Sequence, residues 1–264
     1  MMRRIDGSVP FRGGGFAPLN LPLAGVATLV GLVVLWQAAD WLGMISTLFL
    51  PAPANIGVAL YDLTISGELW KQLSASLERL AVGWIIGTVF GIGVGLAVGL
   101  SSWWRSPGMA VVSALFPIPK IALVPLFIIW FGIGESSKII TLAFGVFFPT
   151  VITTAGGVDN VPRSLIRMAQ SFGLSHAAIV RKIVLPAALP AILSGFRVTA
   201  SIAIVLLVAA EMIGADRGIG AFVLSAGNLY DTDNLLAGIV VLSLLGLAVA
   251  WVIGLLERML LAWR

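Results

Sequence analysis

Side chains that could carry acid–base or nucleophilic chemistry are scarce in this chain. It contains no cysteine, and His176 is its one histidine. A catalytic site needs a nucleophile with a base, paired carboxylates or a metal cluster. The apolar runs hold no close pair of acidic residues, and His176 falls in a predicted turn. The sequence therefore disfavours an intramembrane enzyme, and it predicts no metal site.

Among the ionisable residues inside or at the ends of long apolar runs, the candidates for function are Lys120, Arg197 and Glu211. A charge at membrane depth is costly, so it marks a substrate path unless another role explains it. Lys120 can line such a path, or its ammonium can extend to the nearer headgroups. Arg197 can support the scaffold of an inner gate or contact a substrate. Glu211 can bond to the backbone of a broken helix or face a protein outside the membrane.

The composition is that of an integral membrane protein. Hydrophobic residues make up 59% of the 264 residues and charged residues 11%, with a mean hydropathy of +1.06. A soluble domain carries about 25% charged residues. The net charge of +4 is better explained by basic cytoplasmic loops of a membrane protein than by a surface that binds nucleic acid. No glycine is followed by lysine, so the chain has no phosphate-binding P-loop.

Apolar runs of roughly 20 residues, the length that crosses a bilayer, predict an all-α protein with six transmembrane helices. Residues 1–20 and 259–264 are predicted as cytoplasmic tails of a transmembrane domain at 21–258. An interfacial helix, with Tyr61 and Trp70 at headgroup level, is predicted after the first span. The predicted spans are residues 21–42, 77–100, 109–131, 139–157, 188–213 and 235–256.

Basic residues determine the predicted orientation, because cytoplasmic loops carry an excess of Lys and Arg. Six spans with both termini inside place the basic loop at 158–187 in the cytoplasm. Five spans would put this loop and the C-terminal tail on opposite faces. The basic residues assigned to the inside are Arg3, Arg4, Arg12, Arg105, Arg163, Arg167, Arg181, Lys182, Arg258 and Arg264.

Two spans carry helix-modifying residues. Prolines at 117, 119 and 125 surround Lys120 and predict a broken helix, which is tolerated where it is buried or lines an aqueous cavity. In the second span, glycines recur every four residues from Gly83 to Gly99, which lets another helix approach closely. This stripe can serve packing or a rocking surface. Glu78 and Arg79, which open that span, are expected to pair with each other.

The loop at 158–187 is predicted to hold two helices. Pro162 can open the first, and Gly173 can end it in a left-handed conformation. The residues predicted to share one apolar face of this first helix are Leu165, Met168, Ala169 and Phe172. Ser175 can cap the second helix, which runs to Leu185 and is interrupted by Pro186.

The residues of this loop resemble a segment of the permease subunits of binding-protein-dependent ABC importers. The family pattern is Glu-Ala-Ala, three residues, Gly, nine residues, Ile, one residue, Leu-Pro. Arg167 stands where the family has Glu. The resemblance implies a type I importer permease fold with a cytoplasmic coupling helix, which docks into a groove of the ATPase. The residues of this chain that match the segment are Ala169, Gly173, Ile183, Leu185, Pro186 and Pro190.

The resemblance also implies the functional residues and partners. Coupling to the ATPase falls to Arg163, Arg167, Ala169, Gly173, Leu185 and Pro186, and the translocation path to Pro119, Lys120, Pro125, Arg197 and Glu211. The expected partners are a second permease copy forming a homodimer, two ATPase subunits that bind ATP and Mg²⁺, a periplasmic or extracellular substrate-binding protein, and membrane lipid. No nucleic acid and no cofactor of its own are expected.

The stretch FPIPKIALVPLFIIWFGIGE is similar to the permeases for sulfonates and taurine. This similarity implies import of a small organic anion across the inner membrane, with a sulfonate as the leading substrate. Nitrate, bicarbonate or a thiamine-precursor-like compound are the alternative substrates.

Overall fold

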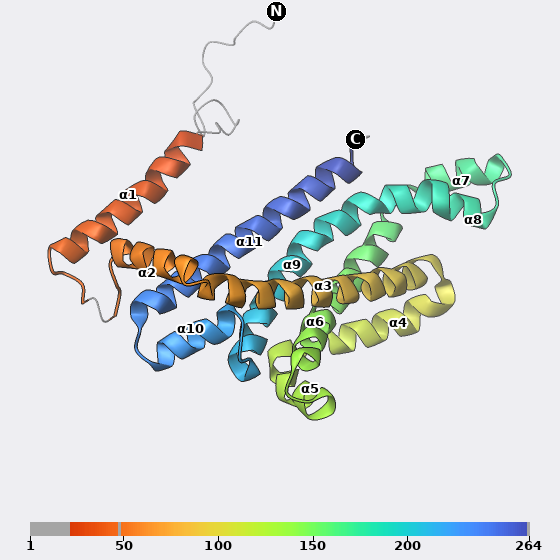
Figure 1. Ribbon diagram of the computed structural model, residues 1–264. Helices are drawn as coiled ribbons and strands as arrows, with labels where there is room; N and C mark the ends of the chain where they lie inside the picture. The colour runs from red at the N-terminus through yellow and green to blue at the C-terminus, as the bar shows by residue number, and fades with distance from the viewer. Residues whose placement is uncertain (1–21, 47–48, 263–264) are drawn as a thin grey trace, which may run out of the picture. The chain divides into compact units, whose positions relative to one another are not determined.

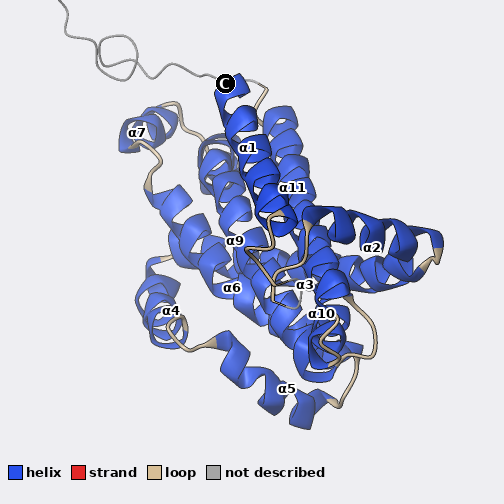
Figure 2. Cartoon of the chain, turned by 90° about the vertical axis from the view of Figure 1, so that its left-hand side faces the viewer, coloured by secondary structure: helices blue, strands red, loops and turns tan. Residues whose placement is uncertain are grey.

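The computed structural model describes residues 22–46 and 49–262, and the tail predicted at 1–20 lies outside them. Every regular element among the described residues is a helix (Figures 1 and 2). Contacts divide the chain into two units, residues 1–57 and 58–264. The helices are α1 (Pro22–Trp41), α2 (Pro53–Ile65), α3 (Glu68–Leu100), α4 (Ser102–Leu115), α5 (Val124–Phe131), α6 (Glu135–Asp159), α7 (Arg163–Ser171), α8 (His176–Ile179), α9 (Leu185–Gly214), α10 (Ile219–Asn228) and α11 (Thr232–Leu260), with the short helical turns η1 (Lys120–Leu123) and η2 (Val180–Val184).

Five of the described helices are long and apolar enough to cross a membrane, and a sixth span forms if the bent pair at 102–131 counts as one. The prediction of six spans in an all-α fold therefore agrees with the structure. The boundaries differ in places. Helix α3 begins at Glu68, nine residues before the predicted second span, because the second part of the segment predicted as interfacial belongs to it. The first part forms α2, and Gly67, with a φ of 79°, separates the two helices.

The glycine stripe of α3 packs tightly against α6. A methyl group added at Gly91 would lie 2.6 Å from Cβ of Thr150, and one added at Gly95 would lie 2.6 Å from Cβ of Thr154. Only glycine allows the backbones of α3 and α6 to approach this closely. The structure thus shows the packing role predicted for the stripe.

The third predicted span is broken, as the prolines predicted. Helix α4 ends at Leu115, the chain turns through Pro117 and Pro119, and the axis changes direction by 85° before α5. Pro125 lies in the first turn of α5, where its missing N–H costs nothing. Figure 2 shows α4 and α5 as separate helices joined by a loop.

The interruption predicted at Pro186 is wrong. The helix that begins at His176 runs through η2 into α9 and ends at Gly214. The reason is η2, a π-helical turn that ends at Val184, two residues before Pro186. A π turn shifts the hydrogen-bond register, so the missing N–H of a proline can be accommodated without ending the helix.

A further helix, α10, was not predicted. It lies between the fifth and sixth spans and is followed by a turn at Tyr230, which has a φ of 57°. Its ten residues are too few to cross a membrane, so the length of the apolar runs does not predict it. Figure 1 shows α10 near one end of α9, whereas α7 and α8 lie near the other end.

Candidate translocation and coupling sites

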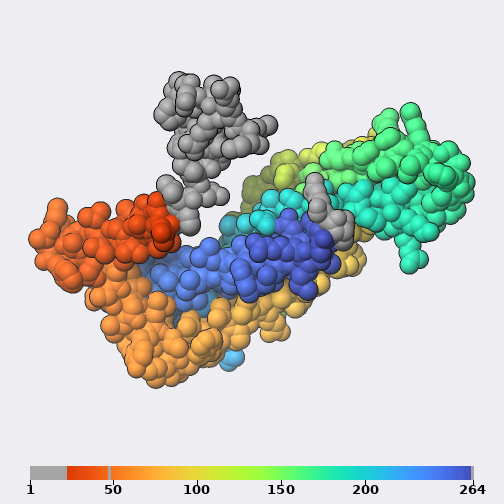
Figure 3. Space-filling view, turned by 90° about the horizontal axis from the view of Figure 1, so that it is seen from above, coloured from red at the N-terminus to blue at the C-terminus, as the bar shows by residue number. Residues whose placement is uncertain are grey.

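The loop predicted to couple to the ATPase forms two short helices joined at Gly173. Gly173 has a φ of 70° and follows the C-terminal turn of α7, so the predicted left-handed conformation is present. The side chain of Ser175 accepts a hydrogen bond from the N–H of Ala178, 3.4 Å away, as predicted for the cap of the second helix. The space-filling view shows α7 and α8 projecting at one end of unit 58–264 (Figure 3).

Helix α7 does not bury the whole apolar face predicted for it. Ala169 is buried in an apolar cluster with Val161, Ile179 and Val184. Leu165, Met168 and Phe172, which were predicted to share its apolar face, are exposed, and Phe172 is 76% exposed. Arg163 and Arg167 are exposed as well. The projecting helix therefore presents apolar and basic side chains together.

The last two residues predicted to couple to the ATPase lie at the start of α9. Leu185 is half-buried and Pro186 is exposed. Nearby, the Arg105 guanidinium at the start of α4 donates two hydrogen bonds, of 2.6 and 2.5 Å, to the carboxylate of Asp159. This pair ties α4 to the end of α6 from which the loop departs.

Lys120 lies at the break after α4. Its ammonium donates to the carbonyl oxygen of Phe116 and to that of Leu115, 3.3 Å away. The ammonium also lies 5.1 Å from the ring centroid of Phe116 and 5.2 Å from that of Phe148. The last carbonyls of a helix have no helical partners and carry partial negative charge, so Lys120 stabilises the end of α4.

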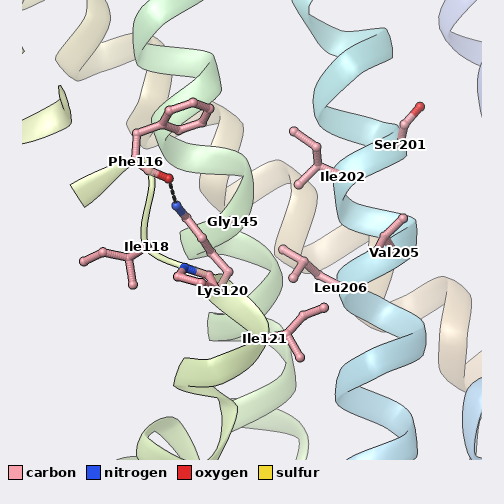
Figure 4. Close-up of a pocket in the computed structure, with 10 residues that line it drawn as sticks. Phe116, Ile118, Lys120, Ile121, Gly145, Ser201, Ile202, Val205 and Leu206 are labelled. Carbon is pink, nitrogen blue, oxygen red and sulfur yellow. Dashed lines mark hydrogen bonds between the residues drawn. The ribbon is translucent and has the colours of Figure 1, made fainter. Parts of the chain in front are cut away.

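The same lysine lines a cavity of about 460 Å³ between the break, α6 and α9. Figure 4 shows Lys120 and Ile121 on one side, Gly145 behind, and Ile202, Val205 and Leu206 of α9 opposite. Pro119 also lines it, whereas Pro125, Arg197 and Glu211 are not among its lining residues. The structure thus brings together two of the five residues predicted for the path.

Arg197 and Glu211 instead form ion pairs. The guanidinium of Arg197 donates a 2.5 Å hydrogen bond to Glu257, which joins α9 to α11. Glu211 is 1% exposed and accepts from Arg79 at 2.7 Å. The predicted pairing of Arg79 with Glu78 is wrong, because Glu78 is exposed and the partners of Arg79 are Glu211 and Glu135.

Arg79 is a residue whose role the sequence did not indicate. It is buried, and it donates two hydrogen bonds to Glu135, of 2.5 and 2.7 Å, one to Glu211 and one to the carbonyl of Arg217. It therefore joins α3, α6, α9 and the segment before α10. A search for acidic residues distant in sequence but at the same predicted membrane level would have suggested these partners.

Three N–H groups at the start of α10 donate to side chains of this network. The N–H of Gly218 donates to Gln72 at 2.6 Å, that of Ile219 to Ser76 at 2.9 Å, and that of Gly220 to Glu211 at 2.8 Å. The N-terminal amides of a helix lack helical partners and must be satisfied when buried. Glu211 thus bonds to backbone, but at the start of α10, whereas the predicted role was a bond to the backbone of a broken helix.

Comparison with known proteins agrees with this architecture. Residues 87–261 match the family model described as the binding-protein-dependent transport system inner membrane component. The chain belongs to this family. The permease is 39% identical over 246 residues to the taurine transport system permease protein TauC of Escherichia coli (strain K12), covering 90% of this chain and 89% of that one.

Other comparisons extend this result. The permease is 39% identical over 235 residues to the putative aliphatic sulfonates transport permease protein SsuC of Escherichia coli (strain K12), covering 89% of both chains. A structure of the MetNI methionine ABC transporter in inward-facing conformation matches with a TM-score of 0.63 and 22% identity, covering 74% of this chain and 98% of that chain. The predicted type I importer permease fold is therefore confirmed.

Membership in this family identifies the type of protein. The chain is a multi-pass inner-membrane permease of an ABC transporter, which works with ATPase subunits and a substrate-binding protein. It is not itself an enzyme, since ATP hydrolysis takes place on the separate ATPase.

Proposed function

We propose that this permease imports a sulfonate, as one of two identical copies in the membrane. The observation that carries the proposal is the 39% identity, over about nine-tenths of the chain, to permeases for taurine and for aliphatic sulfonates. A cation beside a cavity, Lys120, supports an anionic substrate, because a charge lowers the barrier for an anion in an otherwise apolar passage. Pro119 borders this passage at the break in the helix, and Pro125 begins α5 just after the break.

Coupling is proposed to occur at α7 and α8, with both termini and this loop in the cytoplasm. The exposed Leu165, Met168 and Phe172 offer the apolar contact area, and Arg163 and Arg167 offer charge. Apolar anchors surrounded by charged residues are typical of specific protein interfaces. Four other residues of the predicted coupling set fix the position of the projecting helix α7. They are Ala169, Gly173, Leu185 and Pro186.

The remaining proposed residues have supporting roles. The Arg197–Glu257 pair holds α9 against α11 at the inner end of the permease, and Glu211 holds the outer end of α9 against α10. Membrane lipid covers the exposed apolar side chains of the spans. The permease needs no cofactor of its own, and ATP with Mg²⁺ binds to the ATPase.

Uptake by the reconstituted complex tests this function. The permease is purified with its ATPase, placed in proteoliposomes with ATP inside, and supplied with binding protein loaded with taurine or with 1-pentanesulfonate. ATP-dependent accumulation of a sulfonate is the expected result. Uptake of nitrate, bicarbonate or a thiamine precursor, with no uptake of either sulfonate, would contradict the proposed substrate. Elution of the permease as a monomer in the active complex would contradict the homodimer.

A further inference from the structure

The walls of the Lys120 cavity have an uneven distribution of charge. Lys120 supplies one cation, and the hydroxyl of Ser201 is the other polar side-chain group among the lining residues. That hydroxyl donates to the carbonyl of Arg197 at 3.0 Å. The described residues that line the cavity include no acidic side chain, and the others are apolar or glycine.

The ammonium of Lys120 has bonding capacity left for a ligand. It carries three N–H donors, and two of them have backbone partners, the carbonyls of Leu115 and Phe116. Both partners are neutral, so the positive charge is not cancelled by a carboxylate. The other side of the cavity is apolar, with Ile202 and Leu206 of α9 pointing toward the lysine segment (Figure 4).

We propose that this cavity is a passage site for sulfonates with apolar tails and that it discriminates against taurine. This inference rests on the proposed function and specifies its substrate class. The sulfonate lies at the Lys120 ammonium, and the alkyl chain lies against the aliphatic side chains of α9. Sequence comparison does not make this distinction, because the identity to the taurine permease and to the aliphatic sulfonate permease is the same 39%.

The physical reason lies in the second charge of taurine, an ammonium two carbons from the sulfonate. With the sulfonate at Lys120, this ammonium enters an apolar space close to a like charge and finds no carboxylate there. Burial of an unpaired charge is costly, and a nearby like charge increases the cost. An alkyl chain gains free energy in the same place. Each methylene removed from water should tighten binding up to about fourfold until the cavity is filled.

Binding to the purified permease in lipid nanodiscs tests the inference without the binding protein. Saturation-transfer NMR is recorded on ethane-, propane- and pentanesulfonate, with taurine as competitor. Affinity is expected to rise with chain length, and taurine is expected to compete at least about tenfold more weakly than pentanesulfonate, a factor that corresponds to 1.4 kcal/mol. Equal competition by taurine, absence of pentanesulfonate binding, or affinity independent of chain length would overturn the proposal.

Lys120→Gln identifies the site, because the amide still donates to the carbonyls at the end of α4 but has no charge. Pentanesulfonate binding should weaken about tenfold or more, the equivalent of 1.4 kcal/mol. Lys71→Gln is the matched control, since Lys71 is an exposed lysine of α3 outside the cavity. Unchanged binding to Lys120→Gln, or an equal loss in Lys71→Gln, would contradict the assignment of the site.

The two proposals can fail separately. If the proteoliposomes take up taurine at saturating loaded binding protein as fast as pentanesulfonate, the discrimination is wrong while sulfonate import stands. If neither sulfonate is taken up although the binding protein stimulates the ATPase, the proposed function is wrong.

Discussion

Arg79 and Glu211 form an ion pair of 2.7 Å whose side chains are 4% and 0% exposed. Removal of one partner from a buried pair is strongly destabilising because a charge remains buried without compensation. Glu135, the second carboxylate on Arg79, is different, since its side chain is 60% exposed. The two acidic partners of one arginine should therefore contribute unequally to stability.

Arg79→Met is expected to lower the free energy of unfolding by about 3–5 kcal/mol, because it leaves Glu211 charged and enclosed. Glu135→Gln should cost about 1 kcal/mol or less, because the Arg79–Glu211 pair stays intact. Unfolding in mixed micelles, followed by circular dichroism, measures both. The double variant Arg79→Met/Glu211→Gln should be more stable than the sum of the single effects predicts. Equal losses for Arg79→Met and Glu135→Gln would refute this ranking.

The α3–α6 contact gives a second prediction. Gly91→Ala should destabilise the permease by about 1–3 kcal/mol, because its new methyl group would overlap Thr150. Gly93→Ala is the matched control two residues away, where no neighbouring element lies within 4 Å of the added methyl group. This control should be neutral or stabilising by up to about 1 kcal/mol. The same unfolding assay compares the two, and similar stability of both variants would argue against tight packing.

The turn between α7 and α8 can be tested by two substitutions at one position. Gly173 has a φ of 70° and open space around it, so conformation rather than volume limits replacement. Gly173→Val should abolish most ATPase stimulation by loaded binding protein, whereas Gly173→Asn should retain it, because asparagine tolerates the left-handed region. Stimulation that survives in Gly173→Val would show that the turn is not needed for coupling.

Charge on the projecting helix gives a fourth prediction. Arg167→Glu should weaken assembly with the ATPase by about tenfold, corresponding to 1.4 kcal/mol, and the wild-type complex should weaken at high salt. Lys71→Glu is the control for the charge reversal, since Lys71 lies in the first turn of α3, outside the proposed interface on α7 and α8. Titration of labelled ATPase into permease nanodiscs measures both affinities. Full-strength assembly of Arg167→Glu would exclude an acidic partner for this residue.

The spans could be predicted from the sequence because bilayer thickness fixes the length of an apolar run. The break around Pro119 could be predicted because proline removes a local hydrogen bond. The Arg79 network could not, since Gln72, Glu135 and Glu211 come together only when three helices pack. The continuation of the helix through Pro186 could not be predicted for another reason. Proline normally interrupts a helix, and the π turn that prevents this has no reliable sequence pattern.

The uninterrupted helix from His176 to Gly214 has a mechanical consequence. Its 39 residues, at about 1.5 Å each, make a rod of about 58 Å. One end carries the turn at Gly173, and Glu211 lies near the other. If the rod pivots at its inner end, a tilt of about 5° displaces the far end by about 5 Å, more than the length of a hydrogen bond. If the coupling proposed at α7 and α8 holds, this helix would act as a lever arm, and such a tilt would carry Glu211 out of hydrogen-bonding distance of Arg79.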